Sequence, residues 1–91
     1  MLAYFDTSAF VPLLIDEPST ARCTESWNNA EIVASSAITY VEVHAALAQA
    51  VRQRRLDELT HRRALRDFST VWADVAHVPA DDAVIRRAAS L

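Results

Sequence analysis

The 91-residue sequence contains no glycine, and this absence excludes several common sites at once. Phosphate-binding loops of the Walker type and the dinucleotide fingerprint both require glycine at fixed positions, so neither motif is present. Ser8 and Ser36 likewise lack the nucleophile elbow that would identify a serine hydrolase. Alanine is instead abundant, with 17 residues, which favours a largely helical protein.

Cysteine is almost as scarce, since Cys23 is the only one, and a single thiol cannot form an internal disulfide. This fits a reducing cytoplasm, where we expect the protein to be located. The three histidines share no metal-ligand spacing with one another or with Cys23, so no histidine zinc site is expected. Residues 9–15, the longest apolar run near the start, are too few to span a bilayer, and Pro12 interrupts them. We therefore expect no signal peptide or membrane anchor.

Lysine is absent too, because all nine basic residues are arginine, and the formal net charge is −3. With 23% charged residues, the chain is neither an acidic disordered tail nor a polybasic RNA coat. Two interpretations of the arginine-rich segment 52–66 stay open: it contacts RNA phosphates, or it is a solvated helix face with interleaved acids. Under the first interpretation, the RNA-binding candidates are Arg52, Arg54 and Arg55.

Apolar residues recur in short blocks, and their spacing predicts alternating strands and helices within one small domain. Buried strands are predicted at residues 2–5, 31–35 and 76–78. Helices are predicted at residues 8–15, 18–27, 38–52 and 56–75, followed by a final helix that opens at residues 79–81. This alternation favours an α/β fold in which helices flank a parallel sheet.

The same pattern predicts particular caps and faces. Thr7 or Ser8 is expected to cap the first helix, and Ile32 and Val33 are expected to be buried in the second strand. The inner face of the 56–75 segment is predicted to contain Leu65, Phe68, Trp72 and Val75. The apolar side of the final helix is predicted to contain Val84, Ile85, Ala88 and Leu91.

Asp6 is the first candidate for chemistry. It follows the first predicted strand, and ligands of open α/β sheets bind at the carboxyl ends of the strands. A carboxylate there, beside the start of a helix, can be held ionised by backbone N–H groups and can bind a metal. The alternative is that Asp6 and its neighbours only cap the first helix, and position alone does not separate the two.

Glu42 is the second candidate. It lies in a predicted helix that is apolar nearly all round, where a carboxylate is costly unless it is paired, protonated or bound to a metal. A structural alternative is a capping box, in which Glu42 would only hydrogen-bond the backbone of Thr39. If Ser36 is the cap instead, Glu42 lies well inside the helix.

Asp6 and Glu42 together suggest a site for a divalent cation. Two carboxylates about 4 Å apart repel by roughly 4 kcal/mol at an effective dielectric constant of about 20, and a hard cation offsets that repulsion. Mg²⁺ typically takes one or two protein carboxylates and keeps several waters. Such an ion can activate water for phosphodiester hydrolysis. Two acids alone are a weak signal, because any α/β domain offers such pairs.

Four segments of the chain resemble PIN-domain ribonucleases of the VapC toxin type. The opening residues 4–11 resemble the strand, Asp-Thr-Ser turn and apolar helix with which those domains begin. Residues 35–47 resemble the second signature of the family, which contains a metal-binding glutamate. Residues 13–19 resemble the segment that follows the first signature, and residues 78–88 resemble the segment before the later acids of the family. The similarity covers essentially the whole chain.

The resemblance implies a three-layer PIN-like fold, with a parallel sheet of about five strands flanked by helices. It implies Mg²⁺ or Mn²⁺ held by three or four acids, among which Asp6 and Glu42 match ligand positions. Thr7 or Ser8 matches the hydroxyl position beside the first acid. The implied activity is RNA hydrolysis by a toxin of a toxin-antitoxin pair, with a VapB-like antitoxin and a homodimer or higher assembly as partners.

Two departures from the family pattern affect these expectations. Pro12 stands where many members have a polar residue, which affects the first helix. The third acid of the family lies beyond the position that matches Leu91, so residues 1–91 are expected to be a single domain without its C-terminal part. Asp81 and Asp82 match a helix start upstream of that acid and are interpreted as caps. We therefore expect the 91-residue chain to bind metal poorly and to cut RNA slowly or not at all.

Two other functions compete with the metal-dependent ribonuclease. The chain could be a non-catalytic interaction module that binds an antitoxin or another copy of itself. It could also be an unrelated α/β hydrolase or phosphotransferase with Asp6 as nucleophile. The sequence after Asp6 lacks the second acid, two residues later, that such phosphatases use as general acid, so this alternative ranks last.

Overall fold

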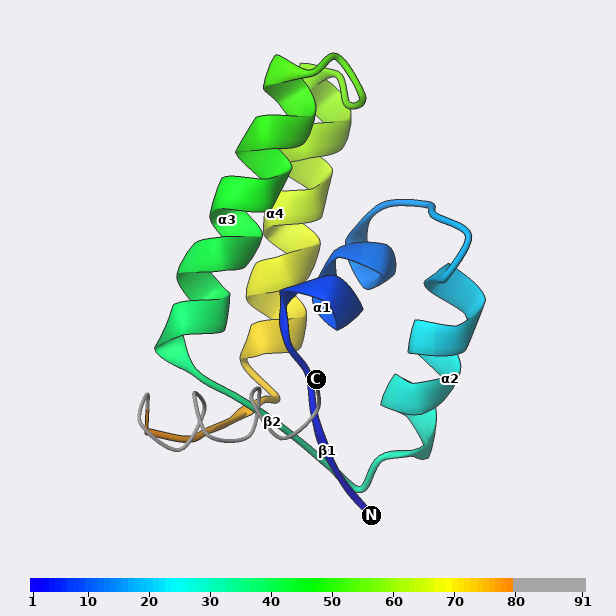
Figure 1. Ribbon diagram of the computed structural model, residues 1–91, viewed down its shortest axis with the longest axis vertical. Helices are drawn as coiled ribbons and strands as arrows, with labels where there is room; N and C mark the ends of the chain where they lie inside the picture. The colour runs from blue at the N-terminus through cyan, green and yellow to red at the C-terminus, as the bar shows by residue number, and fades with distance from the viewer. Residues whose placement is uncertain (80–91) are drawn as a thin grey trace.

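The computed structural model describes residues 1–79, which form three strands and four helices (Figure 1). In chain order the elements are β1 (Leu2–Tyr4), α1 (Thr7–Leu14), α2 (Thr20–Asn29), β2 (Ile32–Ser35), α3 (Ala37–Arg52), α4 (Glu58–Trp72) and β3 (Ala76–His77). The predicted order is confirmed, and the ends of the elements differ from the predicted ones by up to three residues. The predicted final helix, with Val84, Ile85, Ala88 and Leu91, lies outside the described residues.

The strands form one parallel sheet in the order β1-β2-β3, so the predicted α/β fold with a parallel sheet is confirmed. Leu2 pairs with Ile32, and Ala3 pairs with Val33. Because side chains alternate between the two faces of a sheet, Leu2 and Ile32 share one face and Ala3 and Val33 share the other. Val33 is buried, whereas Leu2 and Ile32 are each 54% exposed. The prediction that Ile32 is buried is therefore wrong, because this residue lies on the face opposite the core.

One hydrophobic core joins the sheet to all four helices. Phe10 of α1, Leu47 of α3 and Phe68 of α4 are fully buried in it, and Trp27 of α2 packs against it. Helices α3 and α4 lie side by side as an antiparallel pair (Figure 1). None of the four described helices has the length and apolar composition needed to cross a bilayer.

The inner face of α4 largely follows the predicted pattern. Phe68 is buried in the core, and Leu65 and Trp72 are half-buried against it; Val75 is also buried, but it lies beyond the end of α4. Ala64, one turn before Phe68, is also buried in the core.

Helix α1 begins one residue earlier than the sequence predicts. Asp6 has an extended backbone and its side chain accepts a hydrogen bond from the Ala9 backbone N–H, so Asp6 is the N-cap. The prediction that Thr7 or Ser8 is the cap is wrong, because both residues lie inside the helix.

Helix α2 begins two residues later than predicted, at Thr20 rather than at Pro18. The Thr20 hydroxyl lies 2.7 Å from the carbonyl oxygen of Pro12 and accepts a hydrogen bond of 2.9 Å from the Glu17 N–H. The Thr20 side chain thereby satisfies backbone groups at the end of α1 and in the turn that follows it.

The start of α3 determines where Glu42 lies within the helix. Ser36 has an extended backbone and precedes the first helical residue, Ala37. Thr39 is helical and fully buried, so it is not a cap and the capping-box interpretation of Glu42 is wrong. Glu42 lies inside the helix, as expected if Ser36 precedes it.

Candidate active site

Asp6 stands where β1 ends and α1 begins. Its carboxylate Oδ1 accepts a hydrogen bond of 2.7 Å from the Ser8 hydroxyl and one of 3.2 Å from the Ala9 backbone N–H. Both bonds go to Oδ1, and neither uses Oδ2. The carboxylate is therefore oriented by α1 and still offers an oxygen to a ligand, so capping and metal binding by Asp6 are compatible.

Glu42 reaches the same end of the molecule from α3. The Thr7 hydroxyl donates a hydrogen bond of 3.4 Å to Oε1 of Glu42. Thr7 follows Asp6 directly, so the first turn of α1 brings the two predicted acids to one place, although they are 36 positions apart in the sequence. The predicted hydroxyls have separate roles here, because Ser8 contacts Asp6 whereas Thr7 contacts Glu42.

The carboxyl ends of β1 and β2 are held together below these acids. The Phe5 N–H donates a hydrogen bond of 3.0 Å to the Ala34 carbonyl, and the Ser35 hydroxyl donates one of 2.7 Å to the Phe5 carbonyl. Ser35 is fully buried. This pairing fixes the point at which α1 and α3 leave the sheet, and with it the approach of Asp6 to Glu42.

A hollow of about 600 Å³ opens beside Asp6, and its other lining residues include Thr7, Ser8, Glu17 and Arg22. Glu17 and Arg22 were not among the predicted site residues. No local signal in the sequence marks them, because only the packing of α2 against α1 brings them beside the first acid. Among residues 1–79, Arg22 is the one basic side chain lining this hollow, and a guanidinium there can bind a phosphate.

The chemistry of these side chains fits a hard divalent cation. Asp6 and Glu42 supply carboxylate oxygens, and Thr7 and Ser8 supply hydroxyls that orient them, which is the donor set that Mg²⁺ and Mn²⁺ prefer. Within residues 1–79 no group of three or more histidines, cysteines and acids is close enough to hold a metal ion. Within the described part of the chain, two carboxylates approach each other through Thr7, without a third.

The predicted RNA-binding arginines lie around the turn that follows α3. Arg52, Arg54 and Arg55 are exposed at the turn between α3 and α4, at the end of α3 far from the sheet (Figure 1). Ten residues separate Arg52 from Glu42 along α3, which corresponds to about 15 Å. Arg55 pairs with Glu17 at 3.4 Å, and Arg52 donates a hydrogen bond of 2.7 Å to Gln49. The structure does not bring Arg52 and Arg54 to the two acids, whereas Arg55 contacts Glu17, which lines the hollow beside Asp6.

Comparison with known proteins agrees with this arrangement. The family model described as PIN domain matches residues 3–91. Ribonuclease VapC45 of Mycobacterium tuberculosis (strain CDC 1551 / Oshkosh) and Ribonuclease VapC49 of Mycobacterium tuberculosis (strain ATCC 25618 / H37Rv) are each 42% identical to this chain over 72 residues. The matched part is 79% of this chain and 50% of each relative, so the chain spans about half their length.

The fold and the site define an α/β domain with a pair of acids at the carboxyl edge of a parallel sheet. Together with the match over residues 3–91, they establish that the chain belongs to the PIN-domain family. The resemblance to VapC-type ribonucleases is also confirmed, since both relatives have that name.

Proposed function

We propose that this chain is part of a metal-dependent endoribonuclease, a VapC-type toxin of a toxin-antitoxin pair. The observation that carries the proposal is the hydrogen bond from Thr7 to Glu42, because it joins the second acid to the helix that Asp6 caps. A site of this kind suits phosphodiester hydrolysis, since carboxylate-bound Mg²⁺ can activate water and offset the charge that develops on the phosphate. Membership of the PIN-domain family and the names of the two relatives support the RNA substrate.

Asp6 and Glu42 would hold Mg²⁺, or Mn²⁺ in its place. Ser8 and the Ala9 N–H keep Oδ1 of Asp6 engaged, so the carboxylate cannot rotate freely away from the site. Thr7 restrains Glu42 in the same way. These residues bind and orient, and the solvent-facing hollow with Arg22 leaves room for the phosphate of an RNA strand.

The 91-residue chain itself should bind metal weakly and cut RNA slowly or not at all. Two carboxylates give Mg²⁺ a weaker site than the three or four acids that the family resemblance implies, and within residues 1–79 no third acid joins them. The proposed partners are RNA, a VapB-like antitoxin and a second copy of the chain, and the proposed location is the cytoplasm.

A non-catalytic interaction module is the second candidate. Leu2 and Ile32 are paired in register on the sheet face opposite the core and are both largely exposed, and such an apolar pair suits contact with another protein. Retained binding of a partner by variants that no longer bind metal would favour this candidate over the enzyme.

The direct test of the enzyme is cleavage of a fluorescently labelled single-stranded RNA by the purified chain in Mn²⁺ or Mg²⁺. We expect slow cleavage at most, abolished by chelator, by Asp6→Asn and by Glu42→Gln. Asp74→Asn and Glu25→Gln are matched controls, since both acids are exposed and lie outside the site. Robust cleavage that requires Asp6 would contradict the expectation of a weak metal site. Cleavage at the same rate in both site variants would contradict the proposed ribonuclease function.

A further inference from the structure

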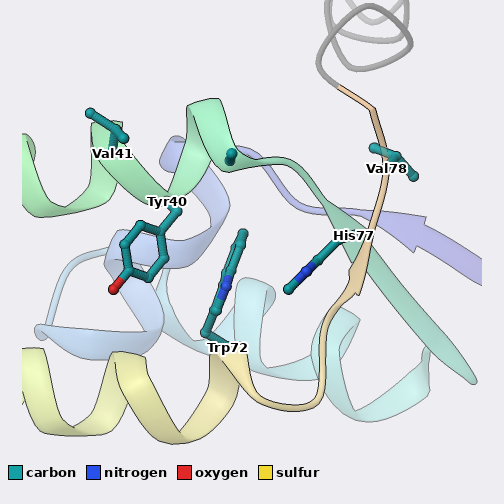
Figure 2. A pocket seen from close by; sticks show the side chains of 6 residues that line it. Tyr40, Val41, Trp72, His77 and Val78 are labelled. Carbon is teal, nitrogen blue, oxygen red and sulfur yellow. The ribbon is translucent and has the colours of Figure 1, made fainter.

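A second pocket opens between α3, the end of α4 and the chain at β3, and neither Asp6 nor Glu42 is among its described lining residues. It has a volume of about 320 Å³ and is lined by Ala37, Tyr40, Val41, Trp72, His77 and Val78. Figure 2 shows the rings of Tyr40, Trp72 and His77 in a row, each reaching in from a different element: α3, the end of α4 and β3. Three separate elements thus present aromatic rings to one space.

Trp72 contacts both of the other rings. The ring centroids of Trp72 and His77 are 5.0 Å apart with an interplanar angle of 25°, so these two rings stack, whereas those of Tyr40 and Trp72 are 5.2 Å apart and tilted by 54°. Tyr40 is 40% exposed and His77 is also exposed. Neither ring therefore belongs to the hydrophobic core, in which Phe10 and Phe68 are fully buried. Aromatic rings that are partly exposed to solvent can bind a planar ligand against their exposed face.

The pocket adjoins the depression that contains Glu42. Ala37 and Val41 line it, and the same two residues line the adjoining depression that contains Glu42. A ligand that fills the aromatic pocket therefore lies next to one of the two acids. In the RNA substrate of a ribonuclease, the flat aromatic group nearest to the phosphate at those acids is a nucleobase, which is linked to that phosphate through the ribose.

We propose that the Tyr40–Trp72–His77 pocket binds one nucleobase of the RNA, next to the phosphate at Asp6 and Glu42. The proposal rests on the ribonuclease function proposed above and adds a base-binding subsite to it. Stacking on aromatic side chains is tolerant of sequence, because every base has a π-face. The pocket would therefore position the strand without selecting one particular base.

Binding can be measured apart from cleavage by keeping chelator present. In a Trp27→Phe background the fluorescence of Trp72 reports on the pocket alone, since Trp27 packs away from it against Phe5 and Phe10. We expect single-stranded hexauridylate to quench this fluorescence saturably. An abasic hexamer with the same sugar-phosphate backbone should bind about tenfold more weakly, which is the loss of affinity expected when one stacked base is removed.

Variants identify the rings that bind. Tyr40→Ala should weaken hexauridylate binding about tenfold, whereas Tyr40→Phe should keep it, because the ring is retained. His77→Ala provides a second test at an exposed position if Tyr40→Ala does not fold, as judged by circular dichroism. Leu59→Ala, at a residue of α4 that is similarly exposed and outside the pocket, should change nothing.

The outcomes separate this proposal from the proposed function. Equal binding of hexauridylate and the abasic hexamer would overturn the base subsite, as would quenching by an apolar peptide but not by RNA, which would assign the pocket to a protein partner. If Asp6-dependent cleavage is observed in either case, the ribonuclease function stands without the subsite. Base-dependent quenching that persists in Asp6→Asn would support the subsite even if the metal site fails.

Discussion

The Thr7 hydroxyl lies 3.4 Å from Oε1 of Glu42, and this contact joins the first turn of α1 to the second turn of α3. Thr7 is adjacent to Asp6, so one threonine couples the positions of both candidate metal ligands. A hydroxyl that orients a ligating carboxylate acts on the metal through that ligand, without touching the metal itself.

Removing this hydroxyl should weaken metal binding while leaving the fold intact. Thr7→Val keeps the shape of the side chain but removes its donor, and we expect Mn²⁺ affinity to fall by about tenfold, as for other residues that orient a ligand. Thr7→Ser should restore most of the affinity. Calorimetric titration with Mn²⁺ tests this, and equal affinities in Thr7→Val and the parent would show that the contact does not orient Glu42.

Asp6 has two roles that substitution can separate. Asparagine is as good an N-cap as aspartate, so Asp6→Asn should lose metal binding but change the free energy of unfolding by less than about 0.5 kcal/mol. Asp6→Ala loses both roles and should also destabilise the chain by about 1 kcal/mol. Urea denaturation of the two variants checks the difference. Equal stabilities would mean that the bond to the Ala9 N–H does not cap α1.

The end of α3 contains a strained residue that glycine would relax. Arg54 has a φ of 59°, and the Arg54 and Arg55 N–H groups donate to the Val51 and Ala50 carbonyls, which is a Schellman motif with a non-glycine residue in the left-handed position. Arg54→Gly should therefore stabilise the chain by about 1 kcal/mol. Arg52→Gly, inside the helix, should destabilise it by a similar amount. Thermal unfolding of both variants tests the opposite signs.

Asp57 makes the stability of α4 depend on pH. The backbone N–H of Thr60, followed by its hydroxyl, holds the pKa of the Asp57 carboxyl below its ordinary value of 3.8. A lowered pKa in the folded state means that the stabilising contribution is complete above pH 3.8 and is lost as the pH falls below it. Asp57→Asn keeps an acceptor that cannot titrate, so its stability should fall less in acid. Urea midpoints at neutral and acidic pH measure this, and parallel losses in both proteins would contradict it.

The two acids could be predicted from the sequence because each has a local signal. Asp6 follows an apolar strand directly, and Glu42 interrupts an otherwise apolar helix. The cap of α1 could not be predicted in the same way, since Asp6, Thr7 and Ser8 are all residues that cap helices well. The hydrogen bond from Phe5 to Ala34 decides it, because it ends the strand pairing immediately before Asp6.

Other features depend on packing between elements far apart in sequence. Ile32 belongs to a four-residue strand whose pattern does not distinguish the two faces of a sheet, and its exposure follows from the register with Leu2. Glu17 and Arg22 lie in the hollow beside Asp6 only because α2 folds back on α1. Neither effect produces a periodic pattern in the sequence from which it could be predicted.

Mn²⁺ binding to the 91-residue chain, followed by electron paramagnetic resonance, tests most directly whether Asp6 and Glu42 form a metal site. The account predicts one weak site that is lost in Asp6→Asn and in Glu42→Gln, and that persists in the controls Asp74→Asn and Glu25→Gln. Unchanged Mn²⁺ binding in either site variant, or equal losses in the controls, would contradict it.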